Sequence, residues 1–116
     1  MKIELAQELK KAGYPQDLNS FYLMARPDKT PSVIYGMPTG KEKSRIPEGT
    51  VFYAYPMLSD LIAACGNGFE ALSKRSEVQW LAMSRLELPD KSQGRLGDSP
   101  EEAVARLWLA LNKKNV

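Results

Sequence analysis

The chain has 116 residues, enough for one domain with one core, and its 43% hydrophobic and 26% charged residues are ordinary for a globular protein. The formal net charge of +2 is too small to indicate a nucleic-acid or membrane-surface partner, and no apolar run approaches the roughly 20 residues that span a bilayer. The chain has no histidine and one cysteine, which excludes Ser-His-Asp and Cys-His catalysis and a thiolate–imidazole zinc site within one chain. We therefore expect no enzymatic activity, no cofactor and no metal site.

The first residues predict a helix and not a signal peptide. Glu4 interrupts the segment in which a signal peptide would place its apolar stretch, and a single cysteine fits a reducing compartment, so we expect a cytoplasmic protein. Residues 2–12 place Leu5 and Leu9 on one face of an amphipathic helix, which Gly13 and Pro15 should end.

The next part of the chain alternates strands with proline-rich connections. Aromatic and β-branched residues predict strands at 18–25, 32–36 and 50–55. Residues 37–49 predict a charged loop. Because prolines and glycines are frequent around residues 26–49, we expect a loop-rich insertion there.

The second half predicts a helix, a hairpin and a loop. Residues 58–65 carry apolar side chains at helical spacing and end at Gly66. Strands are expected at 69–74 and 78–88, with a hairpin turn at 75–77, and residues 89–97 predict a polar loop.

The last helix has a complete start signal. Ser99 should be the N-cap, accepting a hydrogen bond from the N–H of Glu102, whose carboxylate should reach back to the N–H of Ser99. Pro100 suits the first helical position. An apolar stripe follows at Val104, Leu107, Trp108 and Leu111.

These elements predict the α+β class, with a mostly antiparallel sheet of four or five strands and the N- and C-terminal helices packed on it. We expect one domain over residues 1–116, with the loop-rich insertion around residues 26–49.

Several motifs suggest chemistry that other features of the sequence disfavour. The glycine spacing from Gly36 to Gly40 is one residue short of a phosphate-binding loop, Pro38 lacks an N–H, and Glu42 stands where a magnesium-binding hydroxyl belongs. Cys65 lies on an apolar stripe at a helix C-terminus, which favours a core residue over a reactive thiol. Both tryptophans, Trp80 and Trp108, are expected in the core.

The best candidate for a partner-binding surface is the loop-rich insertion. Tyrosine and arginine are enriched at binding hot spots, and methionine adapts to apolar partners. The lysines and arginine there suit phosphate contacts as an alternative, although two glutamates dilute their charge. Two further tyrosines fall on one face of the 50–55 strand and offer either an aromatic surface or core packing. The candidate residues are Tyr35, Met37, Lys41, Lys43, Arg45, Tyr53 and Tyr55.

Two segments together carry a resemblance to known proteins. Residues 55–66 and 97–112, with Trp80 between them and the start at 5–16, resemble a family of small uncharacterised proteins encoded by phages and prophages. The match departs at Met57, where the family tends to have threonine, and at residues 29–48. This resemblance implies a phage or prophage origin and supplies no catalytic residues. We expect an accessory protein that binds a host or phage protein in the bacterial cytoplasm.

A strand and a short loop followed by residues 97–104 at the head of a helix are similar to the end of HicB-type antitoxin domains, over about a quarter of the chain. An antitoxin-like or nucleic-acid-associated module is therefore the alternative function. No pattern in the sequence specifies an oligomeric state.

Overall fold

The computed structural model describes residues 1–16 and 21–112, which divide into two compact units on either side of the Pro56–Met57 bond. Each unit is close to the smallest size at which a chain buries a core of its own. The single domain expected over residues 1–116, with its insertion around residues 26–49, stays a prediction.

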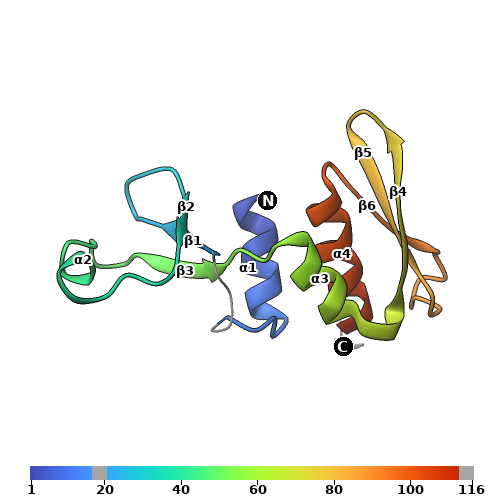
Figure 1. The fold of residues 1–116 in the computed structure, drawn as a ribbon, viewed down its shortest axis with the longest axis horizontal. Helices are drawn as coiled ribbons and strands as arrows, with labels where there is room; N and C mark the ends of the chain where they lie inside the picture. The colour runs from blue at the N-terminus through green and yellow to red at the C-terminus, as the bar shows by residue number, and fades with distance from the viewer. Residues whose placement is uncertain (17–20, 113–116) are drawn as a thin grey trace. The chain divides into compact units, whose positions relative to one another are not determined.

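The N-terminal unit combines helix α1 with a small antiparallel sheet and a short second helix (Figure 1). Among the described residues of this unit, three strands follow the order β2-β1-β3, with β1 in the middle. Its elements are α1 (Ile3–Lys11), β1 (Phe21–Ala25), β2 (Ser32–Tyr35), α2 (Gly40–Ser44) and β3 (Val51–Ala54). The three expected strands are thus confirmed in part, and residues 18–20 of the first lie outside the described residues. The expected loop at 37–49 contains the five-residue helix α2.

Helix α1 packs on β3 through its apolar face. Leu5 and Leu9 are buried, as the amphipathic pattern predicts, and Gly13 follows the helix with a φ of +94°, which favours glycine. Beside that face, the ammonium of Lys10 lies 5.2 Å from the ring centroid of Tyr53. This contact fixes which side of the sheet α1 covers.

Side chains occupy the outer edge of β3. The N–H of Ala54 donates to Oε1 of Gln16 at 2.8 Å, and Nζ of Lys10 donates to the carbonyl of Phe52 at 3.4 Å. Gln16 is held in turn by its own Nε2, which donates to the carbonyl of Tyr14 at 2.8 Å. Two of the backbone groups of β3 that point away from β1, the N–H of Ala54 and the carbonyl of Phe52, therefore have partners.

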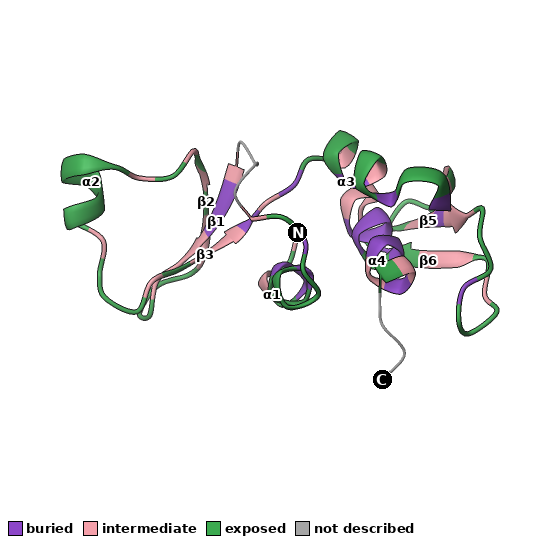
Figure 2. Ribbon diagram, turned by 90° about the horizontal axis from the view of Figure 1, so that it is seen from below, coloured by how far each residue is buried: buried purple, intermediate pink, exposed green. Residues whose placement is uncertain are grey.

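The C-terminal unit places α4 across its sheet and against α3. The strand order is β4-β5-β6, and both pairings within the described part of the unit are antiparallel. Figure 2 shows that α4 is mostly buried, and Trp108 on it is 6% exposed. Trp80 is only half-buried, with the ammonium of Lys74 5.9 Å from its ring centroid. The elements are α3 (Leu58–Cys65), the 3-10 turn η1 (Gly66–Gly68), β4 (Phe69–Ser76), β5 (Gln79–Ser84), β6 (Gly94–Gly97) and α4 (Pro100–Asn112).

The predicted N-cap of α4 is confirmed, but the second hydrogen bond of the cap comes from the residue before the expected one. The N–H of Glu102 donates to Oγ of Ser99 at 3.1 Å, as expected. The carboxylate of Glu102, 4% exposed, accepts from the N–H of Asp98 at 3.2 Å and not from that of Ser99. Gly97 explains the close approach of strand and helix, because a Cβ there would overlap the backbone of Ala103.

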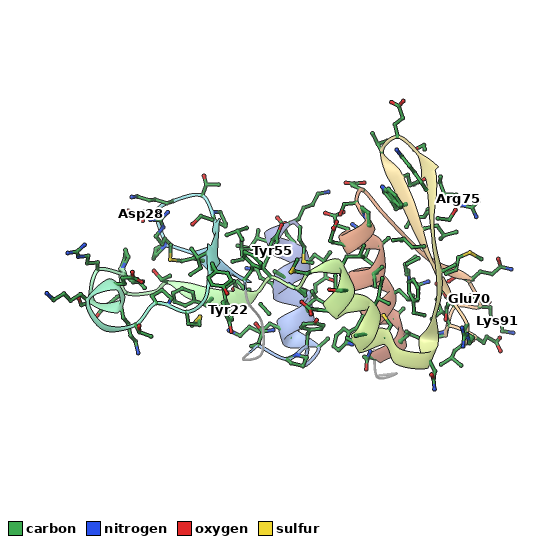
Figure 3. The ribbon with its side chains drawn as sticks, viewed as in Figure 1. Tyr22, Asp28, Tyr55, Glu70, Arg75 and Lys91 are labelled. Carbon is green, nitrogen blue, oxygen red and sulfur yellow. The ribbon has the colours of Figure 1, made fainter. Side chains whose placement is uncertain are left out.

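Strand β6 contradicts the polar loop expected at 89–97. Its sequence Gly-Arg-Leu-Gly has little intrinsic strand preference, and pairing with β5 imposes the extended conformation. The strand expected at 78–88 is shorter, because Oγ of Ser84 donates to the carbonyl of Leu86 at 2.6 Å and closes a turn. The hairpin turn falls at 77–78, one residue beyond its expected centre, with Arg75 near its tip (Figure 3).

The α+β class with antiparallel strands is confirmed, since helices pack on both sheets. Over the described ranges, the six strands are shared between two sheets of three. In the part of the chain that is described, no helix is both long enough and apolar enough to cross a membrane.

Candidate functional site

The residues predicted to bind a partner separate into two groups in the structure. Tyr35 ends β2, Met37 follows it, and Lys41, Lys43 and Arg45 lie on and after α2, so these five are neighbours in one segment. Tyr35 is 79% exposed and Met37 48%. We call these five residues the β2–α2 surface.

A cavity of about 240 Å³ lies within this segment. It is smaller than the roughly 300–1,000 Å³ of pockets that hold drug-sized ligands, so its size suits one or two side chains. Its walls are mostly apolar, with one carboxylate. The lining residues are Met24, Ile34, Tyr35, Gly36, Met37, Pro38, Glu42 and Ile46.

The sheet and one glycine build this cavity. Ile34 pairs with Tyr22, and Met24 lies two residues further along β1, so Ile34 and Met24 share one face. After Tyr35 the chain turns at Gly36, whose φ of +70° favours glycine. After this turn the chain runs out to α2 and returns through Ile46, which lines the cavity together with residues of the strands.

The charges beside the cavity are predominantly positive and open to solvent. Figure 2 shows α2 exposed to solvent. Lys41, Lys43 and Arg45 are exposed and form no ion pair with any described residue, while Glu42 contributes one negative charge at the cavity wall. Because the cations are solvated, their attraction for an acidic partner should be screened by salt.

Tyr53 and Tyr55 are not part of this surface. The hydroxyl of Tyr53 accepts from Nε2 of Gln7 at 3.4 Å, and its ring lies beside Lys10, so its contacts are with α1. Tyr55 is half-buried, one residue beyond β3, and its N–H donates to the carbonyl of Phe21 at 3.0 Å (Figure 3). Both tyrosines stay predictions as binding residues, with contacts that already explain their placement.

Cys65 is a core residue, as the sequence predicted. It is 8% exposed, and its Sγ lies 3.9 Å from the carbonyl oxygen of Val104, to which the thiol donates. Burial raises the pKa of the thiol to about 11, which keeps it protonated at neutral pH.

A second polar cluster, formed by Asp90, Ser92 and Arg95, stabilises the loop that precedes β6. Nη2 of Arg95 lies 3.1 Å from a carboxylate oxygen of Asp90, and Oγ of Ser92 donates to Asp90 at 2.7 Å. The hydrogen bonds from Ser92, followed by the charge of Arg95, lower the pKa of Asp90. Within residues 1–16 and 21–112, no three acidic or thiol side chains converge as a metal site would require.

The sequence analysis missed the cavity walls. Ile34 was visible as the middle of an alternating strand, pointing opposite to Val33 and Tyr35, and this alternation was the available signal. Met24 and Ile46 had no such signal, because their meeting depends on the turn after β2.

Comparisons with protein-family models, curated proteins and solved structures find no significant match to this chain.

Proposed function

We propose that this chain is a non-enzymatic protein that acts by binding another protein through the β2–α2 surface. The observation that carries the proposal is the apolar cavity beside three exposed cations. On the sequence resemblance alone, the proposal extends to a phage or prophage accessory protein that binds a host or phage protein in the bacterial cytoplasm.

The chemistry of the surface defines the partner. A cavity walled by Met24, Ile34 and Ile46 favours an apolar side chain as an anchor, because transfer of such a side chain from water stabilises the complex. Lys43 and Arg45 favour acidic residues beside that anchor. The expected partner is therefore a protein segment that combines a large apolar residue with aspartate or glutamate.

The test compares charge-introducing variants of the full chain as bait in a bacterial lysate. Met37→Glu places a carboxylate beside the cavity and should lower capture of a specific protein about 10-fold or more. Leu86→Glu is the matched control, because Leu86 is similarly exposed, at 54%, in the other unit. Equal capture by the Met37→Glu and Leu86→Glu chains would refute the proposed site.

A nucleic-acid-associated or antitoxin-like module is the second candidate, favoured by the three exposed cations without ion pairs among the described residues. A nucleic acid would be bound with an affinity that falls steeply as salt rises, and Lys41→Ala and Lys43→Ala should each reduce that slope by about one. Binding to an oligonucleotide, measured from 50 to 200 mM salt, separates the two candidates.

A further inference from the structure

The outer edge of β2 has backbone groups without partners. The N–H of Tyr55 donates to the carbonyl of Phe21, so Phe21 and, two residues on, Leu23 direct their backbone groups toward β3. Tyr22 and Met24 therefore face β2, where they pair with Ile34 and Ser32.

It follows that Val33 and Tyr35 direct their N–H and C=O groups away from β1. No described residue donates to or accepts from these four groups. The side chains of Val33 and Tyr35 are also exposed, at 48% and 79%.

Strand β2 is short, but it has no charged residue, proline or bulge to protect it as an edge strand. Its residues 32–35 include no charge and no proline, and they form no bulge with β1. At the opposite edge of the same sheet, Gln16 and Lys10 hold two of the outward backbone groups. Pairing with another strand is therefore open at β2 (Figure 1).

We infer that β2 pairs antiparallel with β2 of a second copy of this chain, about a two-fold axis through Ile34. In this register Val33 of each copy lies opposite Tyr35 of the second copy, and each pair exchanges two backbone hydrogen bonds. A β-branched residue opposite an aromatic one is a favourable cross-strand pair, and no like charges meet between the two strands.

Other antiparallel registers of the two strands leave some outward backbone groups without a suitable partner. An axis through Val33 would place Tyr35 opposite Pro31 of the second copy, which has no N–H to donate. An axis through Tyr35 would require Met37 to continue the strand, although the chain turns at Gly36. Of these three registers, only the one with its axis through Ile34 places all four outward N–H and C=O groups of each copy opposite residues of the second copy that are in extended conformation.

The pairing should be weak, because two four-residue strands bury far less than the roughly 1,200–2,000 Å² of a stable interface. We expect monomer and dimer to exchange at protein concentrations on the order of 0.1–1 mM. This inference rests on the backbone of the strand edge and not on the proposed partner, although Ile34 and Tyr35 also line the cavity.

Disulfide trapping tests the register in the full chain. In the Ile34→Cys chain the two introduced thiols would lie in a non-hydrogen-bonded pair, with Cα atoms about 4.5 Å apart, within disulfide range. In the Val33→Cys chain they would be diagonal neighbours about 7–8 Å apart, beyond easy bridging. We expect roughly 10-fold more oxidised dimer from the Ile34→Cys chain than from the Val33→Cys chain, although Val33 is the more exposed position. The wild-type chain should form no oxidised dimer, because its Cys65 is buried. Equal trapping, or more from Val33→Cys, overturns the inference.

Sedimentation equilibrium of otherwise unmodified protein tests the pairing itself. The wild-type chain should show a mass that rises toward the dimer as its concentration approaches about 1 mM. Val33→Pro removes an outward N–H without breaking a bond to β1, and should stay monomeric, whereas Val33→Thr keeps the N–H and should still pair. Val33→Lys, which leaves the backbone intact, should also stay monomeric. A wild-type chain that remains monomeric at 1 mM, or a Val33→Lys chain that pairs as well as wild type, overturns the inference.

Discussion

Replacing Ser99 with alanine tests the cap that begins α4. The change removes the hydroxyl that accepts from the N–H of Glu102 at 3.1 Å, and it leaves that N–H without its partner at a part-buried helix start. Loss of a serine N-cap costs about 1 kcal/mol, within a range of roughly 0.5–2 kcal/mol. The carboxylate of Glu102 keeps its bond from Asp98, so the cost should stay within that range.

The shift in melting temperature also reports the size of the unit that unfolds. With an unfolding entropy of about 2.1 cal/mol/K per residue, 1 kcal/mol lowers Tm by about 4 °C if all 116 residues unfold together. The same loss lowers Tm by about 8 °C if only the residues from Met57 onward unfold as a unit. The smaller shift for a stability loss of about 1 kcal/mol, with one calorimetric transition, would support the single domain expected from the sequence.

Calorimetry of the Ser99→Ala chain should be compared with that of Ser59→Ala. Ser59 is an exposed serine in the first turn of α3, where removal of the hydroxyl should change stability by less than about 0.5 kcal/mol. Equal melting temperatures for the Ser99→Ala and wild-type chains would refute the cap.

Three further predictions concern other sites. Cys65 should react with a thiol reagent far more slowly in the native chain than in denaturant, because it is buried and its pKa is about 11; equal rates would place the thiol at the surface. Gly97→Ala should destabilise the chain by about 1–3 kcal/mol in urea unfolding, because the added Cβ would meet the backbone of Ala103, and an unchanged midpoint would contradict this close approach. The pKa of Asp90 is lowered in the folded chain, so its interaction with Ser92 stabilises the fold above the ordinary pKa of 3.8 and is lost as pH falls through the folded value. In an NMR titration Ser92→Ala should raise the pKa of Asp90, and an unchanged pKa would exclude that hydrogen bond as its cause.

The predictable parts of the fold are those with local causes. Helix α3 occupies the predicted residues 58–65 because its apolar spacing and the glycine after it act within a few residues. Strand β6 was missed because its extended conformation depends on β5, and nothing within Gly-Arg-Leu-Gly indicates that pairing. Glu102 was expected to bond Ser99, but the path of β6 into α4 brings the N–H of Asp98 to it instead.

The candidate site likewise has residues that could be predicted from the sequence and residues that could not. Tyr35 and Met37 were identified by residue type and by a loop-rich setting, and the structure shows both exposed. The cavity was not predictable, since Met24 and Ile46 meet only through the turn at Gly36. Tyr53 shares its residue type with Tyr35, yet its contacts are with α1, because a strand pattern does not say which face a helix will cover.

The occupied edge of β3 limits how this chain can assemble. An open sheet with two unpaired edges can add chains at both ends and grow into a filament, as cross-β polymers do. Here Gln16 and Lys10 hold two of the outward backbone groups of β3 and hinder addition at that edge, so growth of this sheet through β2 should end after a single addition. Assembly through this sheet should therefore stop at closed pairs, and removal of the Gln16 side chain should favour addition at the β3 edge as well.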